Sequence, residues 1–414
     1  MENTIHDRQA RLPVSTLIFY TVFAFAFLIG GAVFLFGILP FRLFYLVPIA
    51  LLLLPKYGIR ISAVEKIFFV FFLEIVASAL QNHSSATQFI SFLRFVITPF
   101  SMYYLCKNYI KEHNAQKIMQ LCIKVACLQP ILVFFQQAFF DQVNSILPAQ
   151  SQYPDSMDFS FGTFYASDDP SMSFFLMGLV IFLLFDNLNN QFVRNKLLLA
   201  GYFTLGVLFA NSQLSNLLVI FIWVVFLLRK FKVKDLVKSL SIVLVAASLV
   251  LSLGFYDFLK WKISDALTNM SMEAIVNASG ADFEEGRYER TAAVLYYVTQ
   301  PLKILGDGPS AYYDAMNKEY VLANTGQIFT LYAEVGILGL ALGYLIFFVM
   351  SRQKGVSKPM GIGCFLLVSA LTITTFVLTD SSIILAYSIF LRTNLISKNK
   401  EFVPSLVPDG AKGL

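Results

Sequence analysis

The sequence predicts an all-α, polytopic integral membrane protein. Of its 414 residues, 57% are hydrophobic and only 14% are charged, whereas a soluble globular domain carries about 25% charged residues. The mean hydropathy is +0.68, and the chain contains 43 phenylalanines. Apolar runs of roughly the 20 residues that cross a bilayer recur along most of the chain. Spanning helices are therefore the expected elements.

We expect about twelve spanning helices. The first apolar run is longer than the apolar region of a signal peptide and lacks a small-residue cleavage site, so we expect it to be retained as a span. The count is most sensitive between residues 196 and 229, where the letters NSQLSN divide two short runs. The expected spans are 16–36, 40–55, 66–80, 89–106, 117–140, 171–187, 196–211, 214–229, 236–256, 326–350, 361–378 and 380–396.

The distribution of Lys and Arg predicts the orientation, because cytoplasmic loops are enriched in these residues. With the N-terminus in the cytoplasm, the inside segments hold basic clusters such as Lys107 to Lys117 and Arg229 to Lys238. The short outside loops then hold only Arg42. An error of one span would destroy this alternation, so we expect both termini in the cytoplasm.

This topology divides the chain into four parts. Residues 1–256 form a bundle of nine spans with an outer loop at 141–170, and residues 326–400 hold the last three spans. Between the ninth and tenth spans lies one large extracytoplasmic loop with short helices, 257–325, and residues 401–414 are a cytoplasmic tail. Long loops are translocated largely regardless of charge, so the basic residues of the large loop do not contradict the orientation.

The remaining composition argues against several classes of protein. The basic residues are spread over topological loops rather than gathered in one patch, so nothing indicates nucleic-acid binding. No internal repeat is visible, which argues mildly against a transporter built from two related halves. The cysteines lie in or beside apolar runs without a CxxC or Cys/His cluster, so they are expected to be core residues rather than metal ligands or disulfides. They are Cys106, Cys122, Cys127 and Cys364.

The large loop contains a charged, aromatic stretch, EEGRYERTAAVLYYVTQPLKILGDGP, from 284 to 309. Its apolar period predicts a short helix that ends at Pro301. Arg287 and Arg290 are three residues apart and share a face of the first turn, where the helix dipole disfavours cations. Two compensations remain open. The arginines pair with the neighbouring glutamates, or they bind an anion, since guanidinium groups bind phosphate bidentately.

The letters LGDGPSAYY follow this helix. Gly306 and Gly308 permit positive φ and a close approach of another backbone, and Pro309 fixes the exit. The simpler interpretation is a surface turn. No Lys-Ser/Thr follows the glycines, so this is not a Walker phosphate-binding loop.

A few ionisable residues fall within the expected spans, where they are costly and tend to be functional. Glu74 and Arg94 lie in the outer halves of adjacent spans, so either they form a buried ion pair or Arg94 faces a cavity open to the outer leaflet. Lys124 lies near the inner end of its span and is expected to extend to the interface. Glu334 lies about two turns inside its span, where it fixes the loop or acts as an acid or base.

Taken together, several segments resemble the bacterial O-antigen polymerase/O-antigen ligase family, over roughly residues 160–350. The similar features are Gly286-Arg287 before a loop helix, Pro301-Leu302, the Gly306–Pro309 turn, and the letters EVGILG at 334–339 that open a span. Upstream, Gly162-Thr163-Phe164 resembles the Gly-Thr-Phe segment of the family. The hairpin at FANSQLSNLLVIFIWVV lacks the usual Arg of that segment.

The resemblance implies a metal-independent glycosyltransferase without a cofactor, at the outer face of the bacterial cytoplasmic (inner) membrane. Its donor and acceptor would be glycans linked to undecaprenyl pyrophosphate, and its partners the bilayer and the flippase and chain-length regulator of the same pathway. A Wzy-type polymerase joins repeat units into a surface polysaccharide such as O-antigen of lipopolysaccharide, capsule, exopolysaccharide or common antigen. A ligase transfers the finished glycan to another acceptor. Ligases typically carry a His in the large loop, and residues 257–325 contain none, so a polymerase is favoured. A lipid-linked oligosaccharide flippase is the alternative from another class.

The resemblance also implies residue roles. Arginines hold the donor pyrophosphate, and an acidic residue accepts the proton of the acceptor hydroxyl; Glu289, Asp307, Asp314 and Glu334 stay open for this role. Loop tyrosines stack on sugar rings, or anchor the loop at the membrane interface. The expected catalytic residues are Arg287, Arg290 and Glu334, and the expected substrate-binding residues are Arg94, Gly306, Gly308, Tyr288 and Tyr313.

Overall fold

The described part of the protein is almost entirely helical. The computed structural model describes residues 14–35, 62–147, 160–164, 169–185, 195–210, 212–230, 302–311, 313–314, 319–320 and 326–401. Within these ranges, the only strands are β1 (Tyr313–Asp314) and β2 (Glu319–Tyr320), which pair antiparallel. The predicted all-α class is confirmed for the described residues, apart from these two two-residue strands.

The helices follow the expected apolar runs closely. In the N-terminal part they are α1 (Val14–Phe27), α2 (Gly30–Leu35), α5 (Ala63–Gln81), α6 (Ala86–Phe92), α7 (Arg94–Tyr109), α8 (Ala115–Ala138) and α9 (Phe140–Ile146). The central helices are α10 (Asp169–Phe185), α11 (Lys196–Phe209) and α12 (Gln213–Lys230). The last three are α17 (Gly326–Ser351), α18 (Lys358–Leu371) and α19 (Ser381–Glu401).

Some expected boundaries differ from the structure. The runs 16–36 and 89–106 are each divided into two helices, α1 with α2 and α6 with α7. The expected span 361–378 ends early, because α18 stops at Leu371 and turns follow it. The doubtful pair at 196–229 does form two helices, α11 and α12. The expected spans 40–55 and 236–256 lie outside the described residues, as does most of the large loop.

Three helical stretches of the described chain are long and apolar enough to cross a membrane. They are Ala86–Tyr109, Ala115–Ala138 and Gly326–Ser351. Five shorter apolar helical stretches accompany them, including Pro170–Phe185 and Ser381–Ile396.

The core lies around α10 and α19. The side chains of α10 are buried around the whole helix from Pro170 to Leu184, as expected of a helix that is apolar on every face. This helix packs against α8, α11, α12, α18 and α19. Asp380 begins α19: its carboxylate accepts hydrogen bonds from the backbone N–H groups of Ser382 (2.8 Å) and Ile383 (3.0 Å) and from the Ser171 hydroxyl of α10. The two central helices are therefore tied together at their N-terminal ends.

Other helices expose apolar side chains. In α12, Leu217, Phe221 and Leu228 are each more than half exposed, and their spacing places them on one face of the helix. In α5, Phe69 and Leu80 are 61% and 72% exposed. A soluble protein rarely exposes such a continuous apolar surface. These faces are suited to contact with lipid.

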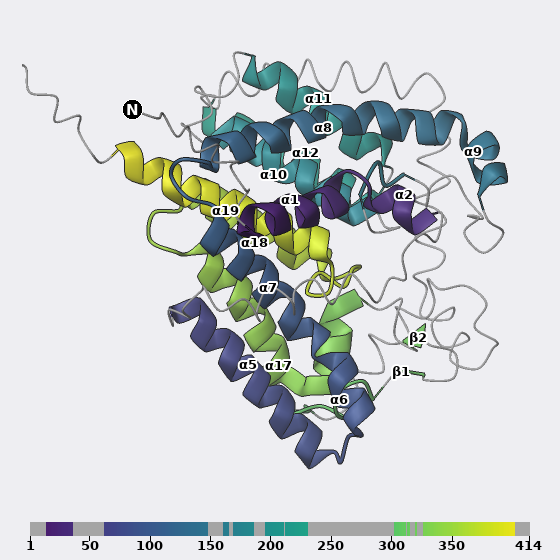
Figure 1. The fold of residues 1–414 in the computed structure, drawn as a ribbon, viewed down its shortest axis with the longest axis vertical. Coiled ribbons are helices and arrows are strands. Elements are labelled where there is room, and N and C mark those ends of the chain that lie inside the picture. Colours follow the sequence, from purple (N-terminus) through teal and green to yellow (C-terminus); the bar gives the residue numbers. More distant parts are fainter. Residues whose placement is uncertain are drawn as a thin grey trace, which may run out of the picture.

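The elements that build the candidate site gather at one end of the molecule. In Figure 1, α5, α6 and α17 meet at the bottom of the view, away from α8 and α11 at the top. Helix α5 packs along α17 and contacts α6 and α7. The C-terminal end of α5 and the first half of α17 thus lie beside the loop segment 302–311.

Candidate functional site

Helix α17 is broken in its middle. Gly336 has φ 71° and ψ −171°, which is not a helical conformation. An unbroken helix would pair the N–H groups of Ile337 and Leu338 with the carbonyls of Ala333 and Glu334. The break leaves these four backbone groups without their helical partners. Unpaired backbone groups are especially costly in a membrane, where broken helices are tolerated only if protein or water replaces the lost bonds.

The loop segment 302–311 provides a hydrogen-bond partner for each of these four groups. The N–H groups of Asp307 and Gly308 donate to the carbonyls of Ala333 (2.8 Å) and Glu334 (2.9 Å). In return, the carbonyls of Lys303 and Ile304 accept from the N–H groups of Ile337 (3.0 Å) and Leu338 (3.4 Å). The loop therefore runs antiparallel along the broken stretch of α17 and completes its hydrogen bonding.

Two glycines make this contact possible. Gly306 has φ 68°, and a Cβ atom there would lie 2.5 Å from the carbonyl oxygen of Glu334. A Cβ atom on Gly336 would lie 2.2 Å from the carbonyl oxygen of Ile304. The predicted close backbone approach at Gly306 is confirmed, and the approaching backbone is that of α17. Gly308, with φ 106°, faces α5 instead, where a Cβ atom would meet the Ser84 hydroxyl at 2.6 Å.

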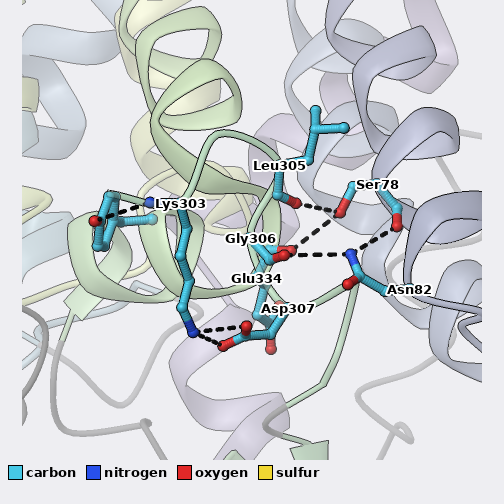
Figure 2. A network of polar contacts seen from close by, with 8 residues as sticks. Ser78, Asn82, Lys303, Leu305, Gly306, Asp307 and Glu334 are labelled. Atoms are coloured by element: carbon cyan, nitrogen blue, oxygen red, sulfur yellow. Dashed lines mark hydrogen bonds and ion pairs between the residues drawn. The ribbon is translucent and has the colours of Figure 1, made fainter. Parts of the chain in front are cut away.

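The C-terminal turn of α5 holds the other side of the loop, as Figure 2 shows. The Ser78 hydroxyl lies 2.6 Å from the Leu305 carbonyl oxygen and 3.2 Å from that of Glu334, as a donor to both. The Asn82 side-chain amide donates to the carbonyls of Gly306 (3.3 Å) and Ser78 (2.9 Å). Ser78 therefore touches both partners of the backbone pairing at once.

Glu334 lies beneath the turn. Its side chain is fully buried, and its Oε2 atom accepts a hydrogen bond from the backbone N–H of Ser310 at 3.1 Å. Ser310 has φ 53°, which is uncommon outside glycine. The Ser310 hydroxyl is 2.7 Å from the Ser91 hydroxyl of α6. The carboxylate of Glu334 thus fixes the exit of the turn, which is one of the two roles expected for it.

An ion pair closes the exposed side of the turn. The Lys303 ammonium lies 2.6 Å and 2.5 Å from the two carboxylate oxygens of Asp307 (Figure 2). Both side chains are partly exposed, at 26% and 33%. Asp307, one of the possible proton acceptors, therefore carries a cation beside it. Lys303 was not among the expected site residues, because a single lysine in a loop gives no distinctive pattern.

Of the two alternatives for Glu74 and Arg94, the buried ion pair does not form. Both carboxylate oxygens of Glu74 are buried and make no hydrogen bond within the described residues. Glu74 lies one turn before Ser78 on α5, and its Oε2 is 2.9 Å from where a Cβ atom on Gly339 would stand, so it points at α17. Arg94 instead begins α7, half-buried, with its guanidinium 5.4 Å from the centre of the Phe95 ring. Helix packing therefore directs the two side chains to different neighbours.

The structure brings together only part of the predicted site. Glu334, Gly306 and Gly308 form one unit. Ser91 contacts that unit through Ser310, and Arg94 lies three residues after Ser91. Tyr313 lies in β1, where its backbone pairs with Tyr320. Arg287, Arg290 and Tyr288, as well as Glu289, lie outside the described residues. Ser78, Asn82, Ser91 and Ser310 were missed, because isolated serines and asparagines near helix ends give no distinctive pattern.

A second non-helical segment, 160–164, docks on α8. The Gln136 side chain donates to the Gly162 carbonyl (3.0 Å) and accepts from the Gly162 N–H (2.8 Å). Buried Gln129 accepts from the Thr163 N–H (3.0 Å), and its amide group donates to the Thr163 hydroxyl (3.0 Å). The Gly162–Phe164 stretch singled out in the sequence is therefore held against α8 by two side-chain amides.

No cluster of three or more His, Cys, Asp or Glu side chains suited to a metal ion occurs within the described ranges. No protein-family model matches the sequence. No curated protein is significantly similar to it.

Proposed function

We propose that this chain is a polysaccharide polymerase of the bacterial inner membrane, with about twelve spans, both termini in the cytoplasm and the loop 257–325 outside. It would join oligosaccharide repeat units carried on undecaprenyl pyrophosphate. The proposal rests on the resemblance of the loop and span motifs to the O-antigen polymerase/ligase family. One structural observation supports it: the two motifs, GDGP at 306–309 and EVGILG at 334–339, are a single hydrogen-bonded unit.

The unit gives the loop a fixed end. A donor pyrophosphate must be held by cations that do not move as charge develops on the leaving group. The turn 303–310 is bonded to α5, α6 and α17, and Arg287 and Arg290 lie 16 and 13 residues before Lys303 in the chain. A loop fixed in this way limits where those arginines can reach.

In the proposed reaction, the acceptor hydroxyl attacks the anomeric carbon of the donor glycan. The bond from that carbon to the pyrophosphate oxygen breaks, and its electron pair leaves with undecaprenyl pyrophosphate. Arg287, Arg290 and Arg94 would stabilise that leaving group. The hydroxyl proton passes to a carboxylate; Asp307 is the partly exposed candidate of the described turn, whereas fully buried Glu334 is better placed to position Ser310.

The test is complementation of a polymerase-deficient strain from the same source, with the glycan ladder separated on a gel. We expect the wild-type gene to restore a multi-unit ladder and Arg287→Ala to abolish it at equal expression. Lys318→Ala, which removes a cation of the same loop outside the motif, is the matched control and should retain the ladder. A band of core plus one repeat unit with the wild-type gene would refute polymerisation. An unchanged ladder in Arg287→Ala would remove that arginine from the site.

The topology has a separate test. With the four native cysteines replaced by alanine, a membrane-impermeant maleimide should label His83→Cys in intact cells. Gln353 follows the C-terminal end of α17, whereas the loop segment 302–311 contacts the first half of that helix. The reagent should label Gln353→Cys only after permeabilisation. Labelling of both positions from the same side would contradict the proposed orientation.

A ligase is the second candidate, and one observation favours it. Although 257–325 contains no histidine, exposed His83 lies in the turn after α5 with φ 52°. Its two neighbours, Asn82 and Ser84, face Gly306 and Gly308. An imidazole is thus available beside the turn. If the chain is a ligase, His83→Ala will leave short lipid-linked glycans intact but block their transfer to the final acceptor.

A further inference from the structure

A cavity of about 480 Å³ lies at the opposite end of α5 and α17 from the candidate site. It is lined by the first turn of α5, the end of α7, the end of α17 with the turn that follows, and the middle of α19. Its volume falls within the range of small-molecule pockets, about 300–1,000 Å³. The sequence analysis assigned no function to this region.

The charged side chains around the cavity are mostly cationic. Lys107, Arg352, Lys354 and Arg392 line it. Lys107 forms an ion pair with Glu65 of α5. In the described part of the chain, the other three make no ion pair with a carboxylate. Several cations around one partly enclosed space attract an anion, and Arg binds phosphate in particular through its planar fork of N–H donors.

A buried hydroxyl provides an independent indication of a ligand. Ser388 of α19 lines the cavity and is only 2% exposed. Its hydroxyl has no hydrogen-bond partner within the described residues. Buried polar groups are nearly always satisfied, because an unmade hydrogen bond costs the full desolvation of the group. An acceptor atom of a ligand in this cavity would satisfy Ser388.

The enrichment of Lys and Arg in cytoplasmic loops accounts for part of this charge. It explains Arg352 and Lys354, which are exposed in a turn. It does not explain Arg392, which is half-buried within α19 and donates from Nε to the Ile110 carbonyl at 3.4 Å. Nor does it explain the buried, unpaired hydroxyl of Ser388 beside the same space. The arrangement is therefore more specific than a basic surface loop.

The cavity lining also includes apolar side chains. They are Val64, Val349, Met350, Leu391 and Leu395. A ligand with an anionic group and an apolar part would match both kinds of lining. We propose that this cavity binds a phosphate group carried by an amphiphilic ligand, and that Arg352, Arg392 and Ser388 contact the phosphate. The site is independent of the proposed glycosyl transfer.

Binding can be measured on the purified full-length protein in a neutral detergent, as the rise in unfolding temperature with added ligand. The probes are phosphatidylglycerol, zwitterionic phosphatidylcholine at the same concentration, and inorganic phosphate. We expect stabilisation by a phosphate-bearing anion but not by phosphatidylcholine. Stabilisation by phosphatidylglycerol alone supports an amphiphilic ligand from the bilayer, whereas an equal effect of inorganic phosphate would contradict the amphiphilic part of the proposal.

Arg392→Gln and Arg352→Gln should each weaken binding about tenfold, the typical effect of losing one charge-assisted hydrogen bond. Arg229→Gln, at the end of α12 and not among the residues that line the cavity, is the matched control and should bind like wild type. Because Arg392 also bonds Ile110, exposed Arg352 carries the test if Arg392→Gln fails to fold. Absence of stabilisation by both anions, or equal stabilisation of wild type and Arg352→Gln, would overturn the proposal.

Discussion

Two non-helical segments dock against helices by different chemistry. Segment 302–311 pairs with α17 through four backbone-to-backbone hydrogen bonds, and two glycines provide the clearance. Segment 160–164 is held by the side-chain amides of Gln129 and Gln136 on α8. The first contact repairs a helix that is broken at Gly336, whereas the second leaves its helix continuous from Ala115 to Ala138.

This difference predicts different sensitivity to substitution. A backbone-to-backbone contact depends on the absence of a side chain at the crossing points and hardly on the identity of its other side chains. A contact made by side-chain amides depends on the shape and the donor and acceptor groups of those amides. Four substitutions test the comparison, in order of decreasing expected effect.

Gly336→Ala should be the most destabilising change. The φ and ψ values of Gly336 belong to a region that is essentially restricted to glycine, and the new Cβ would collide with the Ile304 carbonyl. Strain and collision together should lower the free energy of unfolding by about 3 kcal/mol or more. Thermal unfolding of the purified protein in detergent measures this change.

Gly201→Ala in α11 is the matched control, since nothing lies within 4 Å of a Cβ atom there. It should be neutral or stabilise the helix by up to about 1 kcal/mol. Equal behaviour of the two alanine variants would show that the backbone pairing at Gly336 does not form.

Gln136→Ala should have the next largest effect. It removes both hydrogen bonds to the buried backbone of Gly162, at a cost of about 2 kcal/mol. Gln136→Glu keeps the shape but cannot donate to the Gly162 carbonyl, so it should also destabilise at neutral pH. The same unfolding measurement applies, with exposed Gln142→Ala as a control that should change little. A fully stable Gln136→Glu variant would refute a role for the amide donor.

Ser78→Ala should cost about 1 kcal/mol, because the Leu305 and Glu334 carbonyls lose one hydroxyl donor while the four backbone bonds remain. Amide hydrogen exchange of Asp307 and Gly308 would report whether the loop itself loosens. Ser145→Ala, which removes only an exposed local bond in α9, should stay within about 0.5 kcal/mol of wild type. A loss as large as that of Gly336→Ala would mean that side chains, not backbone groups, hold the loop.

Loss of the Glu65–Lys107 contact should destabilise the fold least of the four changes. It is also the only one of the four whose effect should depend strongly on pH. Glu65 precedes the apolar stretch 66–80. Burial alone would raise the pKa of Glu65, but hydrogen bonds from Lys107 and Ser62 outweigh it and hold the pKa below its ordinary value of 4.5. A lowered pKa means that the carboxylate stabilises the fold above about pH 4.5, and that this contribution disappears as the pH falls through the folded-state pKa.

Glu65→Gln should therefore lower the unfolding free energy by about 1 kcal/mol at pH 7. Unfolding temperatures measured from pH 7 to pH 3 should converge for wild type and variant at the acidic end. A difference that is constant across this range would contradict an ionised Glu65. The backbone contacts at Gly336 carry no charge and should show no such dependence.

Much of the candidate site was outside the reach of local patterns. The sequence indicated that Gly306 permits a close backbone approach, but not that the approaching backbone lies about 30 residues further along the chain. The apolar run 326–350 continues through Gly336, so it predicted an unbroken helix. The break is stable only because a distant loop supplies the missing hydrogen bonds. The Glu74–Arg94 ion pair, one of two alternatives, does not form for a related reason, since helix packing decides which neighbour a buried side chain faces.

The sequence by itself determined the helical, membrane-type character of the chain and the position of most described helices, because length and apolarity of a run are local properties. It also marked Gly306, Gly308 and Glu334 as unusual. Only the tertiary structure decided that these residues and Ser78 form one unit across α5 and α17, and that cations from three segments line a cavity at the other end of these two helices. Hydrogen-bond partners and cavities depend on the packing of segments far apart in sequence, which no local pattern encodes.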